Sequence, residues 1–153
     1  MIQAVRLGGS TSTNFIYVDL WDKFEGTLNA GTNDKPLIAL RSQQTNKTKY
    51  FIPTSATYTN KQRYIKLSYI INFVNTELPV VGLIYLGTKE FPYGLYDITM
   101  WQNTSSSNLD PDGLTNVLYR GLFNLLPVGT PSVEYTEYEN TQQSNVYITN
   151  TYI

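Results

Sequence analysis

Residues 91–125 read FPYGLYDITMWQNTSSSNLDPDGLTNVLYRGLFNL and predict a long β-hairpin. In the first arm one face is apolar and the other is mixed, as a half-buried antiparallel strand requires. Its apolar residues Tyr96, Ile98 and Met100 alternate with Leu95, Asp97, Thr99 and Trp101. The second arm, residues 117–125, is rich in β-branched, aromatic and aliphatic residues, which favour strands. Between the arms, Asp110–Gly113 has the order Asp-Pro-Asp-Gly that a type I turn prefers.

The hairpin also contains a motif that resembles a known group of proteins. Its first arm has the form G-x-Y-x-x-x-x-x-Q, its loop contains N-L-D-P, and its second arm contains the step R-G-L. The residues of this motif are Gly94, Tyr96, Gln102, Asn108, Leu109, Asp110, Pro111, Arg120, Gly121 and Leu122. In these residues the chain resembles small β-rich virion proteins of tailed bacteriophages, those of the crAss-like phages and their relatives with Bacteroidetes hosts above all. The resemblance covers about a quarter of the chain.

The resemblance implies a structural role in a virion, and the family offers no catalytic residues to carry over. The expected function is that of an auxiliary protein that decorates the capsid and stabilises the shell. Its partners would be the major capsid protein or other virion proteins, with a homo-oligomer or multiple copies per particle. It would be made in the host cytoplasm and built into the virion. Two alternatives stay open: a neck, collar or tail component, and a β-sandwich module that binds host glycans.

Composition restricts the chemistry that is available. The 153 residues fit a single domain, which we expect over residues 1–131. The absence of Cys and His excludes disulfides, thiolate and imidazole metal ligands, and Ser-His-Asp catalysis. No pair of carboxylates is marked by its spacing for glycosidase chemistry, and Asp110–Gly113 lacks the late Glu of a calcium loop. We therefore expect no enzymatic activity, no cofactor and no metal.

Short strands are predicted along the whole chain. Thr and Tyr, which favour strands, are frequent, whereas Glu, Lys and Ala are scarce. Beyond the hairpin, strands are expected at residues 2–7, 15–21, 37–41, 47–52, 63–71, 80–86, 133–138 and 146–152. The nearly continuous apolar run at 80–86 is expected to be a central strand. Turn signals about every 8–12 residues predict an all-β fold, a two-sheet antiparallel β-sandwich with either jelly-roll or Greek-key connections.

Alternation within two of these segments predicts which side chains enter the core. At residues 63–71 one face contains Ile65, Leu67, Tyr69 and Ile71. At residues 15–21 one face contains Ile16, Val18 and Leu20, and the other contains Phe15, Tyr17, Asp19 and Trp21. Residues 8–13, which begin with two glycines, are expected to form a flexible link. The longest apolar run, residues 78–86, is too short to cross a bilayer, and residues 1–7 lack a signal-peptide pattern, so no membrane partner is expected.

Charge is distributed unevenly along the chain. Residues 35–76 contain seven basic residues and no carboxylate, whereas residues 77–153 contain eight carboxylates and two basic residues. One interpretation is that adjacent strands of opposite charge pair within the sheet. A second is that a basic face of one copy meets an acidic face of the next. Nucleic-acid binding is the third, and we do not expect it, because a phosphate-binding surface normally comes with a basic excess.

The C-terminal segment, residues 132–153, is polar and acidic but has strand-forming composition. We expect either a last edge strand of the same domain or an extended arm that adds to a neighbour's sheet. The expected partner-contact residues are Trp101, Tyr119, Arg120 and Tyr135. For the glycan alternative, Trp21 and Trp101 with the many Tyr residues would form a sugar-stacking platform, although aromatics on strands more often serve cores and protein interfaces.

Overall fold

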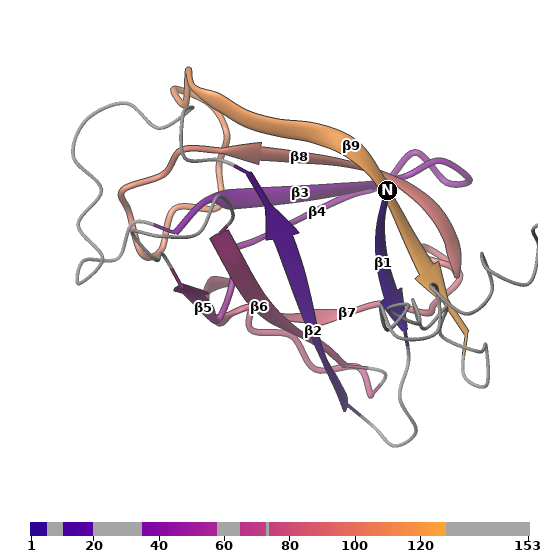
Figure 1. Ribbon diagram of the computed structural model, residues 1–153. Coiled ribbons are helices and arrows are strands. Elements are labelled where there is room, and N and C mark those ends of the chain that lie inside the picture. The colour runs from indigo at the N-terminus through magenta and orange to yellow at the C-terminus, as the bar shows by residue number, and fades with distance from the viewer. Residues whose placement is uncertain (6–10, 20–34, 58–64, 73, 128–153) are drawn as a thin grey trace, which may run out of the picture.

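Two β-sheets pack face to face in the computed structural model, as Figure 1 shows. The structure describes residues 1–5, 11–19, 35–57, 65–72 and 74–127. These residues contain no α-helix, and none of their helical segments is long and apolar enough to cross a membrane. The prediction of an all-β, two-sheet sandwich is confirmed.

One sheet, sheet A, has five strands. In spatial order they are β1 (Ile2–Val5), β9 (Val117–Leu126), β8 (Gly94–Trp101), β3 (Leu37–Ser42) and β4 (Thr48–Phe51). β1 pairs with β9 in parallel, and the remaining pairs are antiparallel. The predicted strands at residues 2–7, 37–41 and 47–52 are confirmed with small shifts. The parallel pair departs from the antiparallel prediction, because alternation within a strand says nothing about which strand lies beside it.

The other sheet, sheet B, is built on β6. Its strands are β2 (Thr11–Val18), β6 (Ile65–Asn72), β5 (Ser55–Thr57) and β7 (Leu83–Tyr85). β2 pairs antiparallel with the whole of β6, and the opposite edge of β6 is shared by β5, antiparallel, and β7, parallel. Because β2 already begins at Thr11, the flexible link predicted at residues 8–13 is wrong for its last three residues, where two of the three are β-branched.

The predicted hairpin is present as β8 and β9. Tyr96, Ile98 and Met100 of β8 are buried, as their alternation predicts. The register shifts between Met100 and Trp101, so Leu118 on β9 has no residue opposite it. Leu118 is an extra residue of this β-bulge and adds its side chain to the core. The bulge is not visible in the sequence, because Val117 and Leu118 are both acceptable on either face of a strand.

The tight turn in the hairpin loop lies one residue later than predicted. The Leu114 N–H donates to the Pro111 carbonyl at 3.0 Å, and Gly113, the third residue, has φ 89°. A positive φ at that position is typical of a type II turn, not of the predicted type I turn. The Asp110 carboxylate accepts from the Asp112 N–H at 2.9 Å and closes a side-chain turn of its own. Asp110 therefore precedes the backbone turn and does not begin it.

The sheets meet in one apolar core to which both contribute. Tyr69 of β6 lies between Phe51 of β4 and Phe123 of β9, with ring centroids 5.6 and 6.4 Å away. The alternation predicted for β6 and β2 is confirmed, since the side chains of the expected core faces are buried: Ile65, Leu67, Tyr69, Ile71, Ile16 and Val18. Phe15 and Tyr17 on the opposite face of β2 are exposed.

The apolar run at residues 80–86 is not a central strand, and that prediction is wrong. Pro79–Val81 forms a 3₁₀-helix, and only Leu83–Tyr85 pairs, at the edge of β6. Pro79 has no N–H to give to a ladder, and Gly82 turns the chain at φ 76°. Only Ile84 and Leu86 of the run are buried in the core, whereas Val81 is 49% exposed.

Some predictions concern residues outside the described ranges and stay predictions. They are the strands at 133–138 and 146–152, the role of residues 132–153 as edge strand or arm, and the contacts of Tyr135 and Trp21.

Candidate functional site

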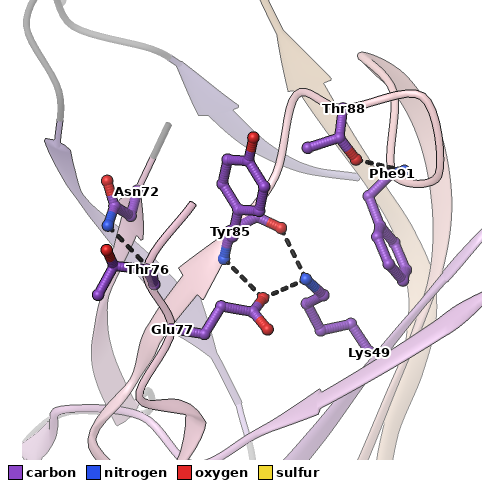
Figure 2. A network of polar contacts seen from close by, with 7 residues as sticks. All are labelled: Lys49, Asn72, Thr76, Glu77, Tyr85, Thr88 and Phe91. Carbon is purple, nitrogen blue, oxygen red and sulfur yellow. Dashed lines mark hydrogen bonds and ion pairs between the residues drawn. The ribbon is translucent and has the colours of Figure 1, made fainter. Parts of the chain in front are cut away.

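A polar network surrounds Lys49, whose side chain is only 13% exposed. Figure 2 shows its ammonium group held between Glu77 and Tyr85. Lys49 Nζ donates to the Tyr85 carbonyl at 2.7 Å and forms an ion pair with Glu77 Oε1. The Tyr85 N–H donates to the same Glu77 oxygen at 2.9 Å. Three elements that are distant in sequence, β4, the segment before η2 (Pro79–Val81) and β7, are thereby joined at one point.

Two aromatic rings complete the surroundings of this ammonium group. Lys49 Nζ lies 4.3 Å from the ring centroid of Phe91 and 5.9 Å from that of Tyr85. A cation over the face of an aromatic ring is attracted by the negative charge density of that face. An ammonium group has three donors, and two of them have oxygen acceptors here. A shielded charge is tolerable only when it is paired and hydrogen-bonded in this way.

The turn at residues 87–91 forms one wall beside this network. Lys47 Nζ contacts Glu90 Oε1 at 2.6 Å, and Thr45 Oγ1 donates to the Glu90 carbonyl at 2.6 Å. The hydrogen bond and the positive charge of Lys47 hold the pKa of the Glu90 carboxyl below its ordinary value. Thr88 Oγ1 accepts from the Phe91 N–H at 3.0 Å. The turn is thus fixed both to the loop between β3 and β4 and within itself.

The segment before η2 is fixed on the other side by Asn72, which is buried. Asn72 Nδ2 donates to the Thr76 carbonyl at 2.9 Å, and Asn72 Oδ1 accepts from the Val74 N–H at 3.0 Å. Both ends of the short segment 74–76 are therefore attached to the last residue of β6, which determines where Asn75 and Glu77 lie.

Together these parts surround an open hollow of about 530 Å³. Its lining consists of Lys49, Asn75, Glu77, Tyr85, Thr88, Lys89, Glu90 and Phe91. None of these residues was singled out in the sequence analysis as a binding residue. The signal that could have found them is the charge order, because both ion pairs join the basic stretch at 35–76 to the acidic stretch that follows it.

The two ion pairs bring opposite charges together within the fold, but they do not join adjacent strands of a sheet, because Glu77 and Glu90 both lie in loops. Lys66 behaves differently. Its ammonium group lies 4.1 Å from the ring centroid of Phe15 and 5.9 Å from that of Tyr17. These three side chains share the outer face of sheet B, the face opposite the core, where Phe15 is 43% and Tyr17 55% exposed. This outer face is a second candidate surface.

The residues expected to contact partners do not form one group. Trp101 is half-buried and Arg120 exposed, and both lie on the outer face of sheet A. Tyr119 turns toward the core and its ring covers Gly121, where an added Cβ would meet the Tyr119 hydroxyl oxygen at 2.5 Å. Less of the Tyr119 side chain is therefore exposed to contact a partner. Tyr135 lies outside the described residues.

Comparison of the chain with family models, with curated proteins and with solved structures finds no match. The likeness of residues 94–122 to phage virion proteins is neither supported nor contradicted by that result. The protein thus has two candidate surfaces, the hollow beside Lys49 and the outer face of sheet B.

Proposed function

We propose that the protein is a bacteriophage virion component, an auxiliary protein that decorates the capsid and stabilises the shell through protein–protein contacts. Two observations support this. The motif between Gly94 and Leu122 resembles that of small β-rich virion proteins. The outer face of sheet B presents Phe15 and Tyr17 to solvent on a strand that is paired along its whole length.

The exposed pair of aromatic rings is the observation that carries the proposal. Interfaces favour large, rigid aromatic side chains, which bury much area for little loss of conformational freedom. Burial of an exposed aromatic ring by a partner contributes about 1.5–3 kcal/mol. Lys66, which covers part of both rings, adds a positive charge at the same place. The partner surface that fits best is therefore apolar, with a carboxylate opposite Lys66.

A rigid sandwich suits a role in a shell. The aromatic contacts of Tyr69 join the two sheets in the core, and the ion pairs of Lys47 and Lys49 attach two loops at the surface. A protein that binds only the assembled lattice stabilises that state by mass action. Many identical contacts, each of modest strength, then reinforce one another through multivalency.

The test is incorporation into particles. We expect the protein in purified virions, and we expect the double substitution Phe15→Ser and Tyr17→Ser to prevent incorporation while the protein stays folded. The matched control is Val74→Ser, since Val74 is 57% exposed but lies in the segment after β6 and not on a strand of sheet B. Normal incorporation of the double variant, or absence of the protein from particles, would refute the proposal. Quantitative staining of purified virions distinguishes the two locations of the protein in the particle. About a dozen copies per particle indicates the symmetry of a neck or tail, and many more copies indicate the capsid surface.

A further inference from the structure

The hollow beside Lys49 has the form of a small-molecule site and is separate from the outer face of sheet B. Its volume of about 530 Å³ lies within the range of ligand pockets, roughly 300–1,000 Å³. Its walls are the turn at 87–91 and the segment 74–77. Hydrogen bonds fix the turn to Thr45, in the loop between β3 and β4, and fix the segment to Asn72 of β6. A site whose walls are already in place loses little conformational freedom when a ligand enters.

Several polar groups in this hollow have no partner within the part of the chain that the structure describes. Glu77 Oε1 accepts from two donors, whereas Glu77 Oε2 makes no hydrogen bond. The Asn75 amide and the Lys89 ammonium group likewise make none with the described residues. The hollow therefore offers free acceptors, free donors and, in the Asn75 amide, a group that is both.

The charges of the lining cancel. Lys49 and Lys89 contribute two positive charges, and Glu77 and Glu90 contribute two negative ones. Because the lining has no net charge, it attracts neither anions nor cations. Tyr85 and Phe91 add aromatic rings, whose electron-rich faces attract weakly polarised C–H groups.

We propose that this hollow binds one neutral sugar residue of a glycan. A pyranose matches each part of the lining: its hydroxyls donate to Glu77 Oε2 and exchange hydrogen bonds with the Asn75 amide, and its C–H face packs on the aromatic rings. Lys49 lines the hollow beside the same two rings and therefore borders the sugar. Its main part is that of a positioning residue, because its ion pair occupies Glu77 Oε1 and leaves the second carboxylate oxygen for the ligand. Affinity for a single sugar would be weak, with a Kd on the order of a millimolar.

Two substitutions separate sugar binding from structural roles. Glu77→Gln keeps an oxygen that can accept from Lys49 and from the Tyr85 N–H, but replaces the free Oε2 acceptor with an amide donor. Asn75→Gly removes an exposed side chain, and glycine tolerates the positive φ of 24° at this position, which alanine would not. Asn75→Gly keeps the test valid even if Glu77→Gln proves poorly folded. The matched control is Tyr17→Ser, which lies on the outer face of sheet B.

The experiment is a titration of the full-length protein, followed through its backbone amide resonances. The probes are glucose, galactose, mannose and N-acetylglucosamine, with glucosamine and N-acetylneuraminic acid as charged comparisons. We expect at least one neutral sugar to give saturable shifts confined to residues 74–77 and 85–91. Each hollow variant should weaken binding about fivefold or more, whereas Tyr17→Ser should not change it. The proposal is overturned by the absence of binding of all four neutral sugars, by binding only of charged sugars, by shifts centred elsewhere, or by unchanged binding in Asn75→Gly.

Discussion

The ring of Tyr69, on β6, packs against the ring of Phe51, on β4, with centroids 5.6 Å apart and planes tilted by 39°. The contact crosses from sheet B to sheet A at the centre of the core. It also places the Tyr69 hydroxyl where no described residue accepts or donates a hydrogen bond. Burial accordingly raises the pKa of Tyr69. The ring stabilises the sandwich, and its hydroxyl opposes that effect.

Removal of that hydroxyl should stabilise the protein. An unsatisfied buried polar group costs roughly 1–3 kcal/mol, so Tyr69→Phe should raise the free energy of unfolding by about 1 kcal/mol. The control is Tyr96→Phe, because the Tyr96 hydroxyl donates to the Pro92 carbonyl at 2.5 Å. That substitution should lower the free energy of unfolding by about 1 kcal/mol. Urea denaturation measures both, and a destabilised Tyr69→Phe would show that its hydroxyl has a partner after all.

Removal of one partner or the other from the Lys49–Glu77 ion pair should have unequal effects on stability. Glu77→Ala leaves the shielded Lys49 ammonium group without its carboxylate, so we expect a loss of about 1–2 kcal/mol, reduced from the fully buried case because Glu77 is 36% exposed. Lys49→Met, which removes the charge and keeps most of the volume, should cost less than Glu77→Ala. Thermal or urea unfolding compares them. Equal losses in the two variants would mean that shielding of Lys49 has no energetic effect.

The exposed pair of Lys47 and Glu90 should show its effect through pH. Lys47 lowers the pKa of Glu90 from its ordinary value of 4.5, so the folded state holds the proton less tightly than the unfolded state. The stabilisation is then fully present above pH 4.5 and is lost as pH falls through the lower, folded pKa. Lys47→Ala should return the Glu90 pKa toward 4.5, which carbon-detected NMR of the Glu90 carboxyl can follow. An unchanged pKa in that variant would exclude Lys47 as the cause.

The sequence predicts those features of the fold that depend on neighbours along one strand. Burial in β8 and β6 follows the period of two, because each side chain's face is set by the pleat. The site depends instead on which segments meet. Lys49 and Glu77 are 28 residues apart, and Lys47 and Glu90 are 43 apart. The charge order indicates that such pairs exist, but it does not say which lysine meets which carboxylate.

The misassigned apolar run depends on a contact with a distant segment as well as on the local effects of Pro79 and Gly82. Gly82 lies against Thr54, and a Cβ on Gly82 would come within 2.5 Å of the Thr54 backbone nitrogen. That N–H donates to the Ser68 carbonyl at 2.8 Å and so belongs to sheet B. A larger residue at position 82 would therefore disturb the sheet, which alternation within the run cannot reveal.

Gly82→Ala should consequently be much more damaging than alanine at a glycine with open space around it. Gly82 combines φ 76° with the close contact to Thr54, whereas Gly113 has φ 89° and no atom within 4 Å of an added Cβ. The left-handed backbone alone costs an alanine about 1–2 kcal/mol, so Gly113→Ala should lose roughly that amount. Gly82→Ala should lose at least about 1 kcal/mol more, because backbone atoms must move to admit the methyl group. Urea unfolding of the two variants measures the difference. Equal losses of unfolding free energy would mean that the backbone around Thr54 moves at little energetic cost, and that glycine is required at position 82 for its backbone conformation alone.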